Sequence, residues 1–427
     1  MSEPARRATS LIGSRRRGRT AYDVSMALTF RTLRSDELRT FQRMVDQSFL
    51  SDTKDDRLER WRGMFEPDRH HAVFDGDELI GGGGIQTRHM TVPGNGPQPC
   101  AAVTSVGVKP GHRRRGVLTR VMTGQLHGLF EDQREAFAAL WASEAAIYPR
   151  FGYGLAAEFT RLDVPRGAAF RPGVEVDGTR IREVSAEEAL PLVKEIYERL
   201  RPTRTGWLSR TDAHWEHHLA DQEDDREGLT AFRYAVHPQG YAVYRVKSDW
   251  RERGPRNELH VRTLAAENDQ AYAALYRYLL DLDHVGEVKY FTASDDPIVH
   301  LLDDARLALR ARTDSLWVRL VEVDRALSLR RYLSDVDVVL DVTDAFCPWN
   351  QARWRFTVKG GEASVRRVDD APDVALDVQA LGAAFLGGTR LTTLARGQRV
   401  RELTPGTLNG LSHAFLGDHE PHCPEVF

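Results

Sequence analysis

The residues best suited to chemistry lie in the stretch 101–119, AAVTSVGVKPGHRRRGVLT. Val103, Val106 and Val108 with their small neighbours predict a buried strand, Pro110 ends it, and helical spacing begins at about Arg114. The unpaired N–H groups of a first helical turn, the helix dipole and the small Gly116 together favour a bound phosphate. The residues alone leave nucleotide, cofactor and simple anion binding open, as well as a merely solvated basic helix start.

A second stretch, SEAAIYPRFGYG from Ser143 to Gly154, follows a strand expected at about 136–142 and holds a candidate proton donor. The pKa of a phenol, near 10, is close to that of a thiol, so Tyr148 is suited to protonate a departing thiolate. The alternative is that Tyr148 packs with Phe151 and Tyr153 as an ordinary aromatic core residue.

The first stretch resembles the coenzyme A pyrophosphate loop of the GNAT acetyltransferases, although Leu118 stands where a glycine or alanine is usual. Together, GHRRRGVL and SEAAIYPRFGYG are similar to the Eis ("enhanced intracellular survival") family over nearly the whole chain. This resemblance implies that acetyl-CoA is the co-substrate and that its contacts are Val106, Gly107, Val108, Arg114, Arg115, Gly116, Val117, Leu118, Thr119, Ser143 and Glu144.

The resemblance also implies the catalytic groups: Tyr148 as general acid and the C-terminal carboxylate of Phe427 as base. An α-carboxylate has a pKa of about 3.5, so we expect it to act through water or by positioning the amine. Asp52, Trp61 and Glu425 are expected to contact an aminoglycoside-like polycation or a lysine-bearing acceptor. Val426 stands where the family has an acidic residue, and this departure bears on acceptor preference.

The composition disfavours several classes of protein. A net charge of −3 argues against a dedicated nucleic-acid binder, and no apolar run has the length of a membrane span. Three scattered cysteines predict neither disulfides nor a metal site, so the cytoplasm is the expected compartment. The family resemblance implies a homohexamer.

The patterns predict an α/β (α+β) chain of three domains behind a basic extension at 1–25. A catalytic GNAT domain is expected at 26–165, with a helix after Ser35 and a hairpin turn at Asp75-Gly76. A second, degenerate GNAT domain is expected at 166–315, with a helix capped by Ser185. Its counterpart of the phosphate loop has no arginine or glycine, and Glu267 there would repel a pyrophosphate.

The third domain, expected at 316–427, resembles a sterol carrier protein. Thr404-Pro405 predicts the start of a helix. Four aromatic residues of this domain are predicted to lie in its core: Trp349, Trp354, Phe385 and Phe415. Two other functions are therefore weighed against acetyl transfer: a lipid or sterol carrier, and a non-catalytic module that binds coenzyme A.

Overall fold

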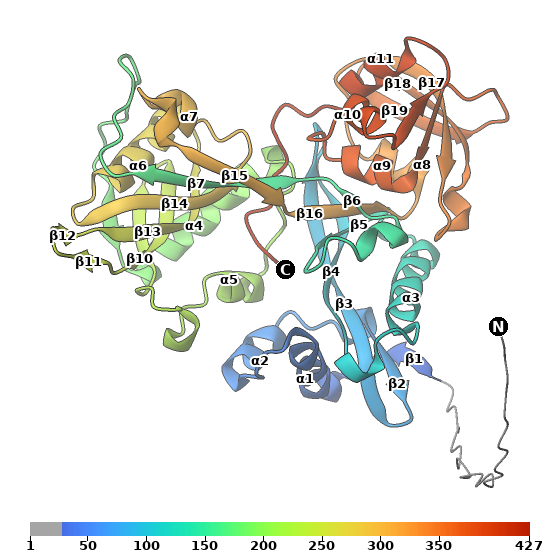
Figure 1. Cartoon of the computed structure of the whole chain (residues 1–427), viewed down its shortest axis with the longest axis horizontal. Coiled ribbons are helices and arrows are strands. Elements are labelled where there is room, and N and C mark those ends of the chain that lie inside the picture. The colour runs from blue at the N-terminus through green and yellow to red at the C-terminus, as the bar shows by residue number, and fades with distance from the viewer. Residues whose placement is uncertain (1–27) are drawn as a thin grey trace, which may run out of the picture.

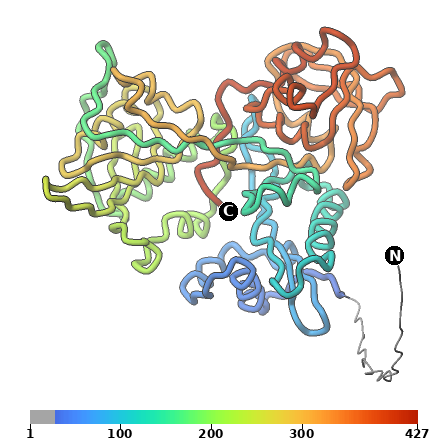
Figure 2. Tube along the Cα trace, in the orientation of Figure 1, coloured from blue at the N-terminus to red at the C-terminus, as the bar shows by residue number. Residues whose placement is uncertain are grey.

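The computed structural model describes residues 28–427, which form three parts, each built around its own sheet (Figure 1). The expected extension at 1–25 lies outside the described residues. The trace in Figure 2 shows the chain ending near the centre of the molecule, between the first two parts. Within the described residues, no helix is long and apolar enough to cross a membrane.

The first part is a seven-stranded sheet in the order β1-β2-β3-β4-β5-β16-β6. Three helices accompany it: α1 (Leu38–Phe49), α2 (Asp55–Arg62) and α3 (Val117–Asp132). The strands are β1 (Thr29–Thr32), β2 (His70–Asp75), β3 (Glu78–Val92), β4 (Gly96–Val108), β5 (Phe137–Trp141), β6 (Gly154–Leu155) and β16 (Leu316–Leu320). The expected hairpin joins β2 to β3 at Asp75-Gly76.

Helix α1 illustrates how the sequence pattern becomes packing. Leu38, Phe41, Met44 and Val45 recur at helical spacing and are buried. Phe49, which the same helical spacing predicts to be buried, is instead 48% exposed at the last turn of the helix. It lines the large cavity described below.

The second part repeats this plan with the order β15-β7-β14-β13-β10-β9-β8. Ser185 caps α4 by accepting a hydrogen bond from the Glu188 N–H, as predicted. The strands are β7 (Glu158–Pro165), β8 (Arg182–Val184), β9 (Arg233–His237), β10 (Gly240–Lys247), β13 (Asn257–Ala266), β14 (Val285–Ala293) and β15 (Leu309–Asp314), with a small hairpin of β11 (Trp250–Arg251) and β12 (Gly254–Pro255). The helices are α4 (Ala186–Leu200), α5 (Asp212–His218), α6 (Asp269–Asp281) and α7 (Ile298–Leu301).

The third part has a five-stranded sheet in the order β19-β18-β17-β20-β21. Trp354, Phe385 and Phe415 are core residues, as predicted. The helix expected at Thr404-Pro405 begins later, because the Glu402 carboxylate accepts hydrogen bonds from the N–H groups that open it. The elements are β17 (Val336–Thr343), β18 (Ala352–Lys359), β19 (Glu362–Arg367), β20 (Val374–Asp377), β21 (Val400–Glu402), α8 (Val323–Ser328), α9 (Val378–Ala384), α10 (Leu391–Arg396) and α11 (Thr407–Ala414).

Two segments run antiparallel from one sheet into the other and bind the first two parts together. Strands β6 and β7 follow each other along the chain, as do β15 and β16, and the two runs pair throughout. Strand β16 therefore belongs to the first sheet although it follows residue 315, and β7 belongs to the second sheet although it precedes residue 166. The sequence predicts three domains that follow one another along the chain, and it does not predict that β7 and β16 lie in the sheet of the neighbouring domain.

The third part is fixed to the first through buried polar and aromatic contacts. Arg319 of β16 forms a fully buried ion pair with Asp344 at 2.6 Å. Trp349 stacks on Phe130 of α3 with ring centroids 4.2 Å apart. These contacts hold the third part against β16 and α3 of the first part.

Candidate active site

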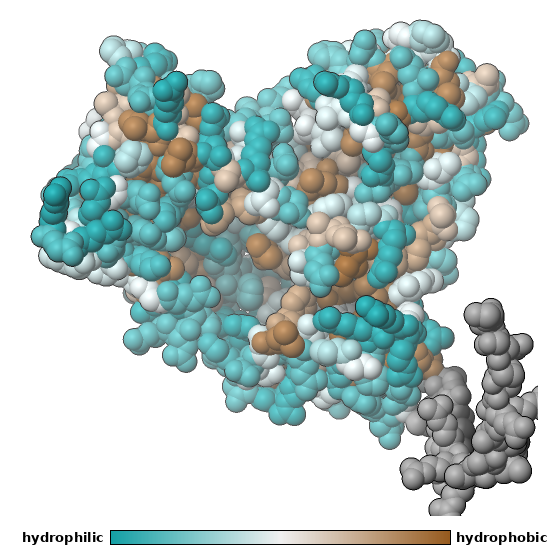
Figure 3. Space-filling model, viewed as in Figure 1, coloured by the Kyte–Doolittle hydropathy of each residue, from teal (hydrophilic) through white to brown (hydrophobic). Residues whose placement is uncertain are grey.

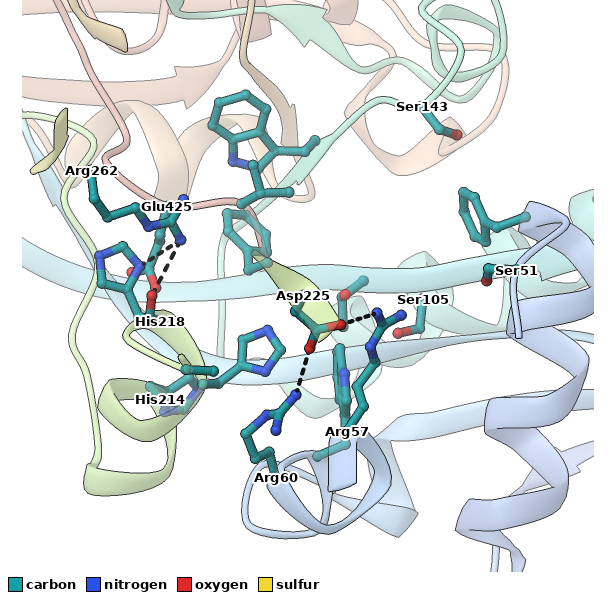
Figure 4. A pocket seen from close by; sticks show the side chains of 18 of the residues that line it. Ser51, Arg57, Arg60, Ser105, Ser143, His214, His218, Asp225, Arg262 and Glu425 are labelled. Carbon is teal, nitrogen blue, oxygen red and sulfur yellow. Dashed lines mark hydrogen bonds and ion pairs between the residues drawn. The ribbon is translucent and has the colours of Figure 1, made fainter. Parts of the chain in front are cut away.

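A cavity of about 1330 Å³ lies between the first and second parts. Its walls come from α1, α2, β4, the loop after β5, α5, β13 and the last residues of the chain. Figure 3 shows the surface hollowed where these two parts meet, and Figure 4 shows side chains from both parts turned toward one another. The cavity brings together segments more than 300 residues apart in the sequence.

Strand β4 carries a bulge where it lines this cavity. Between the Gly84–Thr104 and Gly82–Gly107 pairs, β4 has one residue more than β3, and Ser105 adopts a positive φ of 53°. A Cβ atom at Gly107 would lie 2.9 Å from Ser48 of α1, so glycine is required there by the close approach of the helix. The bulge changes the direction of backbone groups at the cavity wall.

Strands β4 and β5 run side by side only briefly. They pair at two positions, Ala101 with Ala138 and Ala102 with Ala139, and then separate. One edge of β4 beyond Ala102 is therefore without a partner strand in the described sheet. The backbone N–H and carbonyl groups along this free edge of β4 are available to hydrogen-bond an extended ligand.

The loop after β4 has the geometry of an anion site. Arg114 and Gly116 both have positive φ, 63° and 77°, and no side chain caps the start of α3. A Cβ atom at Gly116 would meet nothing within 4 Å, so the space above the loop is open. Arg114 is exposed, whereas Arg115 pairs with Asp75 at 2.8 Å. The uncapped N–H groups at the start of α3 fit a pyrophosphate.

Tyr148 is buried, with 5% of its surface exposed, and lines the cavity from a short 3-10 helix. Burial, and secondarily the charge of Glu144, raises the pKa of Tyr148 to about 12. The helix ends at Gly152, which has a φ of 85°, and a Cβ atom there would lie 2.9 Å from Val378 of the third part. The third part therefore supports the segment that positions this phenol.

The chain ends inside the cavity, where Glu425, Val426 and Phe427 all contribute to its lining. The Glu425 carboxylate is buried between two arginines, 2.8 Å from Arg88 and 3.3 Å from Arg210. Burial opposes its ionisation, but Arg210 and Arg88 outweigh burial and lower the pKa of Glu425. Thus Glu425, expected as an acceptor contact, is engaged in an ion pair that holds the tail.

Glu425→Gln is expected to lower the free energy of unfolding by roughly 3–5 kcal/mol, since it leaves two buried guanidinium groups without a carboxylate. Because the folded pKa of Glu425 lies below its ordinary value, this contribution is fully present above the ordinary pKa and is lost as the pH falls through the folded pKa. Thermal unfolding from acid to neutral pH measures it. Glu420→Gln, in the exposed part of the tail, is the matched control, and equal stability of wild type and Glu425→Gln at neutral pH would contradict the anchor.

The cavity gathers only part of the predicted site. Among the predicted residues it is lined by Trp61, Val106, Ser143, Tyr148, Glu425 and Phe427. Asp52 is exposed outside the lining, in the loop between α1 and α2, and Glu144 is exposed beside Ser143. The residues 114–119 surround the start of α3, outside the cavity lining.

Several lining residues were missed by sequence reasoning. They come mainly from the second part: His214, His217 and His218 on α5, and Arg262 on β13. Trp61 packs edge-on against His217 with centroids 5.5 Å apart. Three histidines within five residues were a visible signal, but nothing in the sequence places α5 against α2. No three metal-ligating side chains within residues 28–427 are grouped to hold an ion.

The equivalent gap in the second part is filled by its own side chains. Strands β13 and β14 pair up to Val261 and Tyr290, and the Tyr290 hydroxyl then bonds both the N–H and the carbonyl of Leu264, at 3.1 and 3.3 Å. The start of α6 is capped by the Asn268 side chain, and Glu267 pairs with Arg199. The backbone groups that are open in the first part are satisfied here.

These features define an acetyltransferase fold. The model described as "Acetyltransferase (GNAT) domain" matches residues 29–156, a second acetyltransferase (GNAT) domain model matches 206–320, and a sterol carrier protein domain model matches 323–424. The chain is therefore an acetyl-CoA-dependent N-acetyltransferase, and the predicted fold class and enzyme class are confirmed.

The chain belongs to the Eis family. It is 35% identical to N-acetyltransferase Eis of Mycobacterium tuberculosis over 374 residues, covering 84% of this chain and 89% of that protein. It is 37% identical to an uncharacterized N-acetyltransferase of Streptomyces avermitilis, covering 94% of this chain and 100% of the relative. The crystal structure of Eis1 from Mycobacterium abscessus superposes with a TM-score of 0.84 at 34% identity, covering 93% and 100% of the two chains.

Proposed function

We propose that the cavity between the first two parts is where the chain transfers an acetyl group from acetyl-CoA to a primary amine. One observation carries this proposal: the gap between β4 and β5, the buried Tyr148 and the terminal residue Phe427 all border the same cavity. A thioester in the gap and an amine in the cavity would thus meet beside a proton donor and a carboxylate. A thiol-release assay with acetyl-CoA and a panel of aminoglycosides, polyamines and lysine peptides tests it.

In this proposal the first part binds the coenzyme. The N–H groups at the start of α3 hold the pyrophosphate, with Arg114 adding positive charge. The free edge of β4 around Val106 to Val108 bonds the pantetheine, and its N–H groups stabilise the oxyanion that forms when the thioester is attacked. The second part, whose corresponding gap is closed by Tyr290, does not bind coenzyme.

The proton transfers follow from the two remaining groups. The amine attacks the thioester carbon, the carbon–sulfur bond breaks, and Tyr148 gives its proton to the departing thiolate. The carboxylate of Phe427 attracts the incoming ammonium and passes its first proton through water to the solvent, which leaves the neutral amine to attack. As the amide forms, the second proton of the amine passes through water to the Tyr148 phenolate, so the protein ends the cycle unchanged and one proton is released.

Arg114→Glu is expected to weaken acetyl-CoA binding roughly tenfold or more, because it replaces attraction for the phosphates by repulsion. Titration calorimetry measures the effect. Arg43→Glu, the same charge change at an exposed position on α1, should bind the coenzyme as the wild type does. Equal affinities for all three proteins would contradict the coenzyme loop.

The remaining expectations stay predictions. These are a homohexamer, the cytoplasmic location, and an aminoglycoside-like or lysine-bearing acceptor that contacts Asp52 and Trp61. The third part supports the Tyr148 segment through Val378, which lies against Gly152, and through Asp344, which pairs with Arg319; these contacts favour a structural role. The lipid-carrier alternative keeps its own test, saturable displacement of a fluorescent lipid.

A further inference from the structure

A primary amine of the chain itself lies in the cavity. The sequence has six lysines, and two of them line the cavity, Lys54 and Lys289. An arginine at either position would carry the same charge, but its guanidinium stays protonated and cannot act as a nucleophile. We propose that Lys54 is an internal acceptor, acetylated by the same chain that carries it; this inference rests on the proposed acetyl transfer.

The backbone of Lys54 is held close to the strand that borders the gap for the thioester. The hydroxyl of the preceding residue, Thr53, donates to the Asp46 carboxylate of α1 at 2.7 Å. Helix α1 in turn approaches β4 at Gly107, where a Cβ atom would lie 2.9 Å from Ser48. Lys54 is thus anchored on the first part beside β4, and its flexible aliphatic side chain lets the amine reach the cavity wall that β4 forms.

The present partner of Lys54 does not hold it firmly. Its Nζ atom pairs with Asp225 of the second part at 2.8 Å. The two side chains are 35% and 25% exposed, and ion pairs between partly exposed side chains contribute little, so the amine is readily released. Asp225 also lies 3.7 Å from Arg57 and 3.4 Å from Arg60 (Figure 4). These two arginines still neutralise Asp225 when Lys54 leaves.

The reaction is the proposed one with Lys54 in place of an external amine. The ammonium first loses a proton to the solvent, as any amine acceptor must, and the neutral Nζ attacks the thioester carbon. The carbon–sulfur bond breaks, Tyr148 protonates the departing thiolate, and the second proton of the amine restores Tyr148. One acetyl-CoA therefore gives one acetyl-lysine, one coenzyme A thiol and one released proton.

Two opposing effects set the rate of this reaction. The hydrogen bond to Asp225 raises the pKa of Lys54, so only a small fraction of the amine is neutral. Because the amine is tethered beside the thioester, the step needs no second molecule and the effective concentration of the amine is high. We therefore expect a slow but site-specific modification, which is seen when no external amine occupies the cavity.

Lys289 is a matched internal control, because it lines the same cavity in a different setting. It lies on β14 of the second part, 3.0 Å from both Glu258 and Glu287. Two carboxylates hold its ammonium, and the gap of its own sheet is closed by side chains. Lys289 should therefore not be acetylated by the chain.

The test is incubation of the full chain with acetyl-CoA that carries a heavy isotope in its acetyl group, without any other amine. Mass spectrometry of peptides then follows each lysine, and the exposed Lys247 and Lys359 report non-enzymatic acetylation. Lys54 should take up label roughly tenfold or more faster than these two, whereas Lys289 should match them. In the intact Lys54→Arg variant, which keeps the charge opposite Asp225, the fast phase should be absent.

Two further measurements show whether the label enters through the proposed site. Excess coenzyme A should slow the labelling of Lys54 and leave that of Lys247 and Lys359 unchanged, because it competes for the coenzyme loop. The rate constant for Lys54 should not change over a tenfold range of protein concentration, as expected for a reaction within one chain.

The outcomes separate this inference from the proposed function. If external amines are acetylated but Lys54 is labelled no faster than Lys247 and Lys359, the internal acceptor is overturned and acetyl transfer stays intact. Labelling of Lys54 that persists in excess coenzyme A, or whose rate constant rises with protein concentration, also overturns it. Absence of both thiol release and fast labelling, in protein that binds acetyl-CoA by calorimetry, overturns both. Fast labelling of Lys54 that coenzyme A suppresses supports the internal acceptor.

Discussion

Tyr148→Phe is expected to lower kcat by roughly 10²- to 10⁴-fold, because the departing thiolate loses its proton donor. The ring remains, so the packing around it and the affinity for acetyl-CoA, measured by calorimetry, should be preserved. Burial raises the pKa of Tyr148 to about 12, and the phenol therefore stays protonated across the usual assay range. The wild-type pH profile should accordingly show no loss of kcat from this group below about pH 11.

The chain offers a matched control for this variant. Tyr153 lies beside Tyr148 with ring centroids 5.9 Å apart, and it is fully buried with its hydroxyl unpartnered in the described structure. Tyr153→Phe removes the same atom from the same cluster and should leave kcat close to that of the wild type. If Tyr148→Phe also retained wild-type kcat, the acid role would be excluded, and the residue would be one more packed aromatic.

The features that the sequence predicts well are local ones. The strand, turn and helix around 101–119 are specified by residues within a few positions of each other, and the structure places β4 and α3 there. The Tyr148 segment follows its strand as expected because Pro149 and Gly152 fix a short turn by their own backbone preferences.

The features that the sequence does not predict depend on contacts between distant residues. The Glu425–Arg88 ion pair joins positions 337 residues apart, and neither residue has a pattern that identifies the other. The exchange of β7 and β16 between sheets is invisible for the same reason, since both strands read as ordinary buried strands. Arg262 and His218 become lining residues of a cavity only because the second part faces the first, and the sequence does not predict that arrangement.

The chain terminus is where these distant contacts have the largest consequence. Adding one glycine after Phe427 moves the terminal carboxylate by about 3.5 Å while every side chain is retained. We expect kcat/KM to fall by roughly 100-fold or more, since a displacement of this size takes a catalytic group out of position. Deleting Phe427 should have a similar effect, because the new carboxylate then lies one residue too far back.

The ion pair of Glu425 makes this experiment interpretable. The extended chain keeps Glu425 between Arg88 and Arg210, so its thermal unfolding should match that of the wild type, in contrast to Glu425→Gln, which detaches the tail and destabilises the fold. An equal glycine added at the N-terminus controls for the extension itself. A C-terminally extended enzyme with wild-type kcat/KM would show that the terminal carboxylate takes no part in the reaction, and the amine would then need another group to accept its proton.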